Sequence, residues 1–448
     1  MNPADVPSCF QIHERHDERS GKTLITAIHK DGFTVKFFPF IGFSAKFAAA
    51  TIPYGSIHTT FILDGRKIQV PAGTAHFLEH CLFSRDEAGG LFGRLSSLGA
   101  SANAYTAYDH TLYYFHATDD FSDAFRIWLD SLFQPQLDEE RIEAERSIIL
   151  SELNQYRDDP ETRCSQILME NLYSVHPIRL DMIGTADQIR SICSDDLKTV
   201  FNSWYRPERW TLTLAGDLEI TSILKCLADR LEMDLHEKNQ SAPRAVFPEE
   251  PPLPACKLKK VRMSSSTPLF MVGVKNHEKL LPALSGLELA NRACAAHIVL
   301  NTLLSPVSSL YDRLYQEGFI NDSFDFQSVD GDGFSFISCG GESSQPEKAA
   351  SVLQEGLIAA FQSGLDKAVF EAQKKAQAGH ALSLFDSVGR AGLAQARCNL
   401  VGLDLFDYAD IYGKMDEEQA IQMMECLHDE KYYTTAMIVP RRWMNHAT

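Results

Sequence analysis

The sequence lacks the features that mark secreted and membrane-spanning proteins. Its ten cysteines include no Cys-x-x-Cys pair, which favours free thiols in a reducing compartment. No apolar run in the chain approaches membrane-spanning length, and residues 1–19 are polar, without the apolar core of a signal peptide. We therefore expect a cytoplasmic protein with no membrane span.

Positive charge is also scarce. The 448 residues carry 42 lysines and arginines against 60 aspartates and glutamates, so the net charge is -18. An acidic surface repels phosphate backbones and no basic cluster compensates for it, so nucleic acid is not expected as a partner. The chain length predicts two or three domains.

The most specific motif is the pentad His-Phe-Leu-Glu-His at residues 76–80, in a stretch with no helix breaker. In a helix, residues four apart lie one above the other, so His76 and His80 share a face and Glu79 leans over the same side. Two imidazoles can hold a catalytic zinc ion, and a carboxylate beside it can take a proton from water. The order H-x-x-E-H is the inverzincin signature. The alternative is that these side chains lie on the polar face of an amphipathic helix.

Zinc needs a third protein ligand, and a second predicted helix at residues 137–153 offers two carboxylates. Glu145 and Glu152 are seven residues apart, almost two helical turns, so both point the same way. One of them can bind the metal while the other supports a ligand. The candidate apolar positions of this helix are Ile142, Ile148, Ile149 and Leu153. Its remaining acidic residues are expected on a solvated face, namely Glu139, Glu140 and Glu143.

A strand is predicted around Asn103, because small and larger side chains alternate over residues 102–107 as on the two faces of a strand. An exposed strand edge can bind an extended peptide through main-chain hydrogen bonds. We expect Asn103 to contact substrate, and Tyr113 and Tyr114 to pack against the sheet.

The order of predicted elements repeats about a polar, proline-rich segment at residues 241–255, which predicts a domain linker. The elements predicted before it are a sheet at 23–63, helices at 89–98 and 121–132 and a strand at 209–215. Those predicted after it are a strand at 269–274, a helix at 287–304, a hairpin at 324–339, helices at 347–361 and 366–384 and a strand at 434–439. We infer an α+β fold of two homologous domains, 1–240 and 256–448, each a mostly antiparallel sheet packed with helices. The second copy lacks the metal-binding pattern, and two such units facing each other would form a clam-like half chamber.

These residues resemble the pitrilysin-like inverzincin peptidases, which include insulin-degrading enzyme and the mitochondrial processing peptidase, over nearly the whole chain. The resemblance covers the pentad, the pairs Glu145-Arg146 and Ser151-Glu152, and the run Gly-Ala-Ser-Ala-Asn-Ala-Tyr-Thr at 99–106, which is similar to the family's substrate-binding edge strand. It implies Zn²⁺ as the cofactor. The roles that it implies are zinc ligands for His76, His80 and Glu152, the base for Glu79, support of a ligand for Glu145, and substrate binding for Asn103, Ala104 and Tyr105.

One region departs from the family pattern. In single-chain members the second half, or a partner chain, supplies an Arg and a Tyr that bind the substrate carbonyl. Here Tyr315 stands where the Arg is expected, Asp322 or Phe324 stands where the Tyr is expected, and Arg313 is two positions early. This pattern resembles the zinc-bearing chain of bacterial two-component members, so the resemblance implies a heterodimer with a homologous partner chain that supplies Arg and Tyr.

The predicted function is that of a zinc-dependent endopeptidase acting on peptides or small precursor polypeptides held in extended form in an enclosed chamber. The alternative is a non-catalytic structural or binding subunit of the same fold. The sequence leaves open whether the substrate is one dedicated precursor or short peptides in general.

Overall fold

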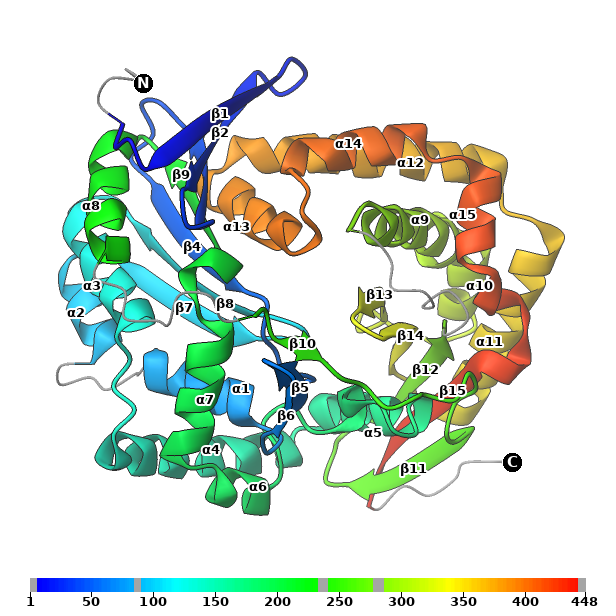
Figure 1. Cartoon of the computed structure of the whole chain (residues 1–448). Helices are drawn as coiled ribbons and strands as arrows, with labels where there is room; N and C mark the ends of the chain where they lie inside the picture. The colour runs from blue at the N-terminus through cyan, green and yellow to red at the C-terminus, as the bar shows by residue number, and fades with distance from the viewer. Residues whose placement is uncertain (1–5, 84–89, 233–240, 277–285, 442–448) are drawn as a thin grey trace. The chain divides into compact units, whose positions relative to one another are not determined.

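The computed structural model describes residues 6–83, 90–232, 241–276 and 286–441 (Figure 1). Helices alternate with largely antiparallel sheets, which confirms the predicted α+β class. Contacts divide the chain into two compact units: unit 1 comprises 1–150, 182–246 and 381–406, and unit 2 comprises 151–181, 247–380 and 407–448. Gly89, the predicted start of one helix, and Gln240, the predicted end of the first domain, lie outside the described residues.

The main sheet of unit 1 has the strand order β1-β2-β3-β9-β4-β8-β7. Its strands are β1 (Phe10–Asp17), β2 (Lys22–His29), β3 (Thr34–Pro39), β4 (Lys46–Ile52), β7 (Ser101–Thr106), β8 (Thr111–Ala117) and β9 (Thr211–Gly216). Strands β3 and β9 run parallel, and all other neighbours in this sheet run antiparallel. Strand β7, the predicted peptide-binding strand, therefore lies at one edge.

The prediction of a single sheet over residues 23–63 is wrong for its last strand. Strand β5 (Thr60–Leu63) pairs with β6 (Arg66–Gln69) and β10 (Arg244–Ala245) in a separate three-stranded sheet. The sequence analysis also missed β1, whose segment Phe-Gln-Ile-His-Glu-Arg-His-Asp is mostly exposed. Charged side chains are tolerated there because β1 forms the other edge of the sheet.

The helices of unit 1 bury apolar side chains within this unit. They are α1 (Thr74–Leu82), α2 (Leu91–Ser97), α3 (Phe121–Phe133), α4 (Glu139–Asp158), α6 (Ala186–Ser191), α7 (Ser194–Trp204), α8 (Ile220–Glu232) and α13 (Val388–Cys398). In α4 the predicted core residues Ile142, Ile149 and Leu153 are buried, but Ile148 is 48% exposed, so its assignment to the core was wrong. Ile148 follows Ile142 by six residues, which turns it well away from the face shared by positions seven and eleven along.

Helix α13 belongs to unit 1 although it comes from the second half of the sequence, and it packs on strands β4 and β9. A Cβ atom on Gly392 would collide with the ring of Phe47, so glycine permits this close approach. Thr51 donates a hydrogen bond to the carbonyl of Ala396 at 2.9 Å. Asn399, just after the helix, donates one to Thr213 at 2.8 Å.

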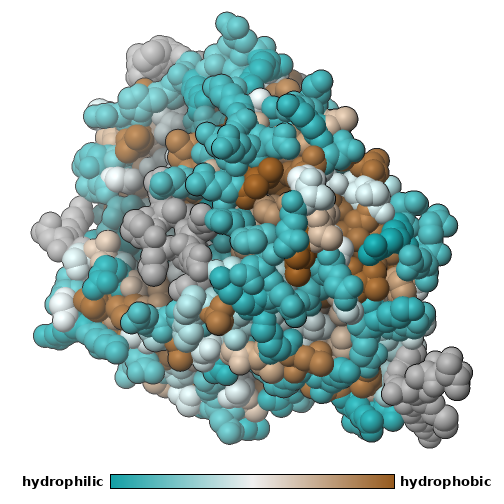
Figure 2. Space-filling model, turned by 90° about the vertical axis from the view of Figure 1, so that its right-hand side faces the viewer, coloured by the Kyte–Doolittle hydropathy of each residue, from teal (hydrophilic) through white to brown (hydrophobic). Residues whose placement is uncertain are grey.

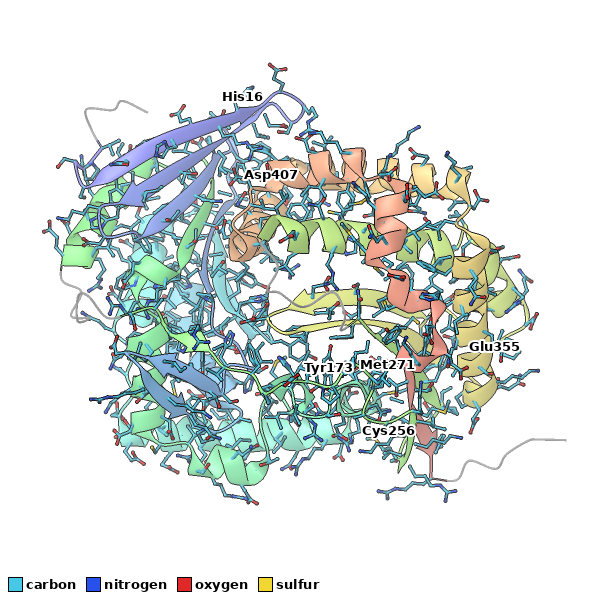
Figure 3. The ribbon with its side chains drawn as sticks, turned by 45° about the vertical axis from the view of Figure 1, so that its right-hand side comes forward. His16, Tyr173, Cys256, Met271, Glu355 and Asp407 are labelled. Atoms are coloured by element: carbon cyan, nitrogen blue, oxygen red, sulfur yellow. The ribbon has the colours of Figure 1, made fainter. Side chains whose placement is uncertain are left out.

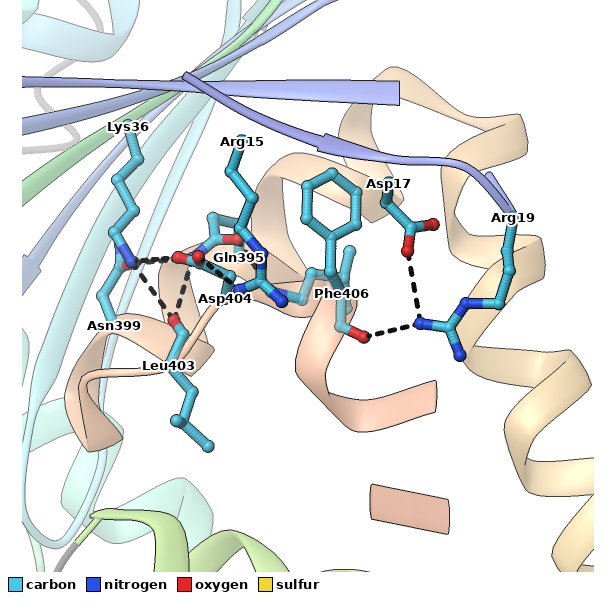
Figure 4. Close-up of polar contacts among 10 residues, drawn as sticks. Arg15, Asp17, Arg19, Lys36, Gln395, Asn399, Leu403, Asp404 and Phe406 are labelled. Carbon is cyan, nitrogen blue, oxygen red and sulfur yellow. Dashed lines mark hydrogen bonds and ion pairs between the residues drawn. The ribbon is translucent and has the colours of Figure 1, made fainter. Parts of the chain in front are cut away.

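Asp404, which follows α13, joins this segment to the sheet through a charged cluster (Figure 4). It pairs with Lys36 Nζ at 2.6 Å and with Arg15 Nη1 at 2.8 Å. Burial opposes the ionisation of Asp404, but the hydrogen bonds and charges of Lys36 and Arg15 outweigh it and hold its pKa below the usual 3.8. The ionised carboxylate therefore stabilises unit 1.

Asp404→Asn is expected to lower the free energy of unfolding at pH 7 by about 1–2 kcal/mol, because the pairs with Lys36 and Arg15 are only partly buried. Since the folded pKa is depressed, this contribution is complete above the unfolded value near 3.8 and is lost as the pH falls through the folded pKa. Urea unfolding between pH 7 and pH 3 measures the difference between the two proteins. A difference that did not shrink below pH 4 would contradict the assignment.

Asp187→Asn is the matched control for this measurement. The Asp187 side chain is 98% exposed and pairs with Arg190 one helical turn away. A pair of this kind contributes little, so we expect its replacement to change the free energy of unfolding by less than about 0.5 kcal/mol.

Unit 2 contains a five-stranded sheet with the order β11-β15-β12-β14-β13. Its strands are β11 (Leu258–Met263), β12 (Leu269–Lys275), β13 (Asp325–Gly331), β14 (Phe334–Glu342) and β15 (Tyr433–Pro440). Strands β11 and β15 run parallel and all other neighbours run antiparallel. This is the order and sense of β3-β9-β4-β8-β7 in unit 1, which supports the predicted duplication.

The remaining helices lie wholly or mostly in unit 2. They are α5 (Pro160–Leu172), α9 (Gly286–Leu304), α10 (Ser309–Gln316), α11 (Pro346–Ser363), α12 (Lys367–Ser383), α14 (Leu405–Lys414) and α15 (Glu417–Met423). Helix α5, from the first half of the sequence, packs on β12 and β15 as α13 packs on β4 and β9. Ser165 on α5 contacts the sulfur of Met271 on β12 at 3.6 Å, and Tyr173, just after α5, donates to the carbonyl of Ser335 on β14 at 3.0 Å; both Met271 and Tyr173 are labelled in Figure 3. Each sequence half thus contributes one helix to the compact unit formed mainly by the other half. The predicted boundaries 1–240 and 256–448 remain a prediction.

The segment 241–255, predicted as a linker, packs against unit 2 through Glu250. The Glu250 carboxylate accepts hydrogen bonds from the backbone N–H groups of residues 174–176 and from Lys275 Nζ at 2.6 Å. Both side chains are almost fully buried. A buried ion pair of this kind fixes the path of the segment because either charge alone would be costly there.

One face of the molecule is mostly polar. On the face drawn in Figure 2, hydrophilic residues predominate and hydrophobic residues form small scattered groups. Among the described residues, no single helix is long and apolar enough to cross a membrane, although the bent pair Gly286–Leu304 and Ser309–Gln316 meets the length and composition required.

Candidate metal centre

Helix α1 carries the pentad, and all nine of its residues are buried. It begins after Gly73, which has a φ of 92°. Any side chain at Gly73 would also collide with the carbonyl oxygen of Ile183, so the start of this helix depends on glycine. The alternative of an amphipathic surface helix is wrong, because His76, Glu79 and His80 are only 9%, 7% and 9% exposed.

His76, His80 and Glu152 form a cluster in which one possible ligand atom from each residue lies within 4.8 Å of the others. The two imidazole centroids are 4.6 Å apart with the rings tilted by 60°. Glu152 lies on α4, an unbroken helix that continues past residue 150, where unit 1 ends. In the part of the chain that the structure describes, this is the one group of His, Cys, Asp or Glu side chains with spacing suited to a metal ion.

Glu145, two turns before Glu152 on α4, is 4% exposed and contacts His80 rather than joining the cluster. Its Oε2 is 3.4 Å from His80 Nδ1, and Arg141 Nη2 is 3.8 Å from its Oε1. A carboxylate that accepts from Nδ1 fixes the tautomer of the ring and leaves Nε2 for a metal. Glu145 thus contacts one of the predicted ligands, and its supporting role stays a prediction.

Arg146 attaches α4 to the rest of unit 1. Its guanidinium donates hydrogen bonds to the carbonyls of Ile189 and Ile192 and lies 5.4 Å from the ring centroid of Phe77 on α1. The sequence analysis placed Arg146 in the family motif but gave it no role. Its contacts hold the carboxylate helix against the histidine helix.

Glu79 is oriented by a side chain that the sequence analysis did not assign. Thr106, the last residue of β7, donates its hydroxyl to Glu79 Oε2 at 2.7 Å. Behind it lie the buried hydroxyls of Tyr113 and Tyr205, 3.0 Å apart. Burial, together with the charges of Tyr205 and Glu79, raises the pKa of Tyr113 well above its usual value, so this hydroxyl stays protonated.

Cys81, next to His80, does not add a thiolate to the site. Burial, and then the charge of Glu145, raise the pKa of this thiol to about 12. A metal-binding cysteine has to be deprotonated, and Cys81 is not part of the metal cluster.

Strand β7 runs from the exposed Ser101 to Thr106 and, among the described residues, pairs only with β8. Asn103 is exposed and donates to the Tyr114 hydroxyl at 3.2 Å, while its Oδ1 accepts from the N–H of Ala104. Tyr113 is fully buried, as expected from its assignment to packing. Asn103, Ala104 and Tyr105 thus lie along an edge strand that ends beside Glu79, with Asn103 exposed and Ala104 buried.

The positions that depart from the family pattern lie in unit 2. Tyr315 on α10 is 43% exposed, stacks on Tyr311 and lies 3.4 Å from Asp322 through its hydroxyl. Phe324 packs edge-on against Tyr311. His297 on α9, the histidine nearest to the pentad's place in the second copy, contacts the Tyr412 hydroxyl at 2.6 Å.

Two family models match the chain. The model described as insulinase (peptidase family M16) matches residues 69–186, which include the pentad and both carboxylates of α4. The model described as peptidase M16 inactive domain matches residues 191–377. Together they cover most of the chain.

Individual relatives match nearly end to end. The uncharacterized zinc protease YmfH of Bacillus subtilis is 28% identical over 435 residues, covering 95% of this chain and 98% of that protein. The crystal structure of an M16-like peptidase from Alicyclobacillus acidocaldarius superposes with a TM-score of 0.85 at 25% identity, covering 97% of this chain and 100% of that one. Pitrilysin superposes with a TM-score of 0.72 at 16% identity, and 98% of this chain corresponds to 47% of pitrilysin.

Proposed function

Because this chain belongs to the pitrilysin-like peptidase family M16, we propose that it is a zinc-dependent endopeptidase that hydrolyses peptides or small precursor polypeptides held in extended form. The observation that carries the proposal is the cluster of His76, His80 and Glu152, with Glu79 held beside it by Thr106 at the end of an edge strand. The name of YmfH, a zinc protease, agrees with this chemistry.

The donor set fits a catalytic zinc ion. Two imidazoles and one carboxylate are ligands that such sites use, with a further position left for water. Ligand atoms within 4.8 Å of one another can close around an ion with bonds of about 2 Å by small side-chain movements. Zinc held by His76, His80 and Glu152 would supply a Lewis acid that makes water a nucleophile near neutral pH.

Glu79 acts as the base in this proposal. The hydrogen bond from Thr106 fixes the Glu79 carboxylate, leaving an oxygen to accept a proton from the attacking water. The protonated Glu79 can then give that proton to the leaving amine. The buried site excludes competing solvent from the carboxylate.

Strand β7 binds the substrate in this proposal. Its unpaired edge can add a peptide strand through main-chain hydrogen bonds, which gives affinity with little dependence on sequence. Residues 103–105 lie along this edge, and Thr106 links its end to Glu79. A peptide paired with β7 therefore brings a backbone carbonyl close to the base.

The proposed assembly is a heterodimer with a homologous partner chain. At the positions where the family carries an Arg and a Tyr, this chain has Tyr315 and Asp322 or Phe324. The charge that develops on the substrate carbonyl therefore lacks these donors, and we propose that the partner supplies them. The cytoplasmic location predicted from the sequence remains a prediction.

The match of residues 191–377 to a model described as an inactive domain favours a second candidate, a non-catalytic subunit of the same fold. Zinc content by mass spectrometry, with cleavage of a mixed peptide library in the presence and absence of a candidate partner chain, distinguishes the two. We expect near-stoichiometric zinc and cleavage that depends on the partner. A chain without zinc and without cleavage would establish the non-catalytic subunit, and full activity of the isolated chain would exclude the heterodimer.

A further inference from the structure

Arg397, on α13, contacts the tyrosine of the predicted substrate strand. Its Nε donates to the Tyr105 hydroxyl at 3.2 Å, and its guanidinium carbon is 5.8 Å from the centroid of the Tyr105 ring. The Tyr105 ring also meets the ring of His110 edge-on, with the two centroids 5.7 Å apart. His110 Nδ1 in turn lies 2.7 Å from Oδ1 of Asp109, so the Asp109 carboxylate is paired with His110.

The terminal nitrogens of Arg397 remain available for a ligand. Arg397 is exposed, and among the described residues no carboxylate pairs with it. The hydrogen bond to Tyr105 uses Nε, which leaves the fork of the two Nη groups to donate to a ligand. Such a fork matches the geometry of a carboxylate, which it binds through two parallel hydrogen bonds.

The alternation of β7 places this fork on one defined side of a bound peptide. Thr106, which bonds Glu79, and Ala104 have their side chains on one face of the strand, whereas Tyr105 and Asn103 have theirs on the other. A peptide added to the edge presents its own side chains alternately to these two faces. The substrate residue opposite Tyr105 therefore directs its side chain to the α13 face, within about one residue of the bond that lies next to Glu79.

We propose that Arg397 is a specificity-determining residue that selects peptides with an aspartate or glutamate side chain opposite Tyr105. The inference rests on the proposed peptidase function and on peptide binding along β7. A net charge of -18 suggests a preference for basic peptides, whereas Arg397 gives a local preference for an acidic side chain. Tyr105 is the positioning residue, because its hydroxyl and ring hold the guanidinium in place.

The test uses the zinc-loaded protein together with its candidate partner chain, and peptides that are identical except for Glu, Gln or Lys at each position near the cleavage site. Relative kcat/KM is measured for the wild type, Arg397→Gln and Arg397→Glu. Binding of the same peptides to Glu79→Gln proteins, with and without the Arg397 changes, is measured by fluorescence anisotropy. Arg390→Gln is the matched control, because Arg390 is an exposed arginine on the same helix whose side chain donates to the carbonyl of Ser383.

At the substrate position opposite Tyr105, we expect the wild type and Arg390→Gln to prefer Glu over Gln by about fivefold to tenfold. Arg397→Gln should abolish that ratio, and Arg397→Glu should reverse it in favour of Lys. A Glu-to-Gln ratio that is the same in the wild type and Arg397→Gln, in cleavage and in binding, would overturn the proposal. If no peptide is cleaved but binding shows the Arg397-dependent preference, the peptidase function fails while the role of Arg397 stands. Absence of both would overturn both.

Discussion

Glu79→Gln is expected to lower peptide cleavage by about a thousandfold, the scale of a lost general base, while zinc stays bound. The amide keeps the size of the side chain and an oxygen that accepts from Thr106, but it does not take a proton from water. Glu79 is not one of the three clustered ligands, so metal binding does not depend on it. Relative kcat on a library peptide in the presence of the candidate partner chain, and zinc content by mass spectrometry, measure the two effects.

Glu140→Gln is the matched control for this prediction, since it makes the same chemical change at an exposed position on α4. It should leave both zinc content and turnover within about twofold of the wild type, as surface changes away from special features usually do. Retention of the wild-type rate in Glu79→Gln would remove Glu79 from the role of base. Loss of zinc in that variant would instead make Glu79 a part of the metal-holding structure.

The elements around the site could be predicted because their signals are local. The pentad at 76–80 and the spacing of Glu145 and Glu152 depend on the helical repeat alone, and α1 and α4 have that repeat. The helix break before Pro160 and the hairpin of β13 and β14 follow from turn residues in the same way. Local periodicity failed for Ile148 only because neighbouring apolar residues do not all fit one helix face.

The contacts that orient the site could not be predicted, since they join residues far apart in the sequence. Thr106 reaches Glu79 across 27 positions, and Arg397 reaches Tyr105 across 292. No spacing rule connects such pairs, because they depend on which sheet each helix joins. The exchange of α5 and α13 between the two compact units is of the same kind.

The strand order that the two sheets share gives a physical reason for the exchange of α5 and α13. In each unit one helix from the other half of the sequence covers the two middle strands, β4 and β9 in unit 1 and β12 and β15 in unit 2. Without α13, residues such as Phe47 and Thr213 would lose a covering that keeps them fully buried. Each sequence half therefore depends on the other to bury its sheet, and truncation at residue 240 would expose apolar surface.

The second large expected effect is on zinc affinity, and it distinguishes the roles of the two carboxylates of α4. Glu152→Gln is expected to weaken zinc binding by about a thousandfold, because it removes a charged ligand from a site of three. Glu145→Gln should weaken it by only about 10- to 100-fold, since Glu145 acts through His80. Competition with a chromophoric chelator measures both affinities on the same scale.

The geometry predicts this ranking. A Glu152 oxygen lies within 4.8 Å of ligand atoms of both histidines, whereas Glu145 contacts Nδ1 of His80 at 3.4 Å and also faces Arg141. Because Arg141 remains in Glu145→Gln, that variant keeps a partly buried positive charge beside position 145, which accounts for a measurable but smaller loss. Glu140→Gln again serves as the control with unchanged affinity. A larger loss in Glu145→Gln than in Glu152→Gln would exchange the two roles, and equal zinc affinity in all three variants and the wild type would place the metal elsewhere in the chain.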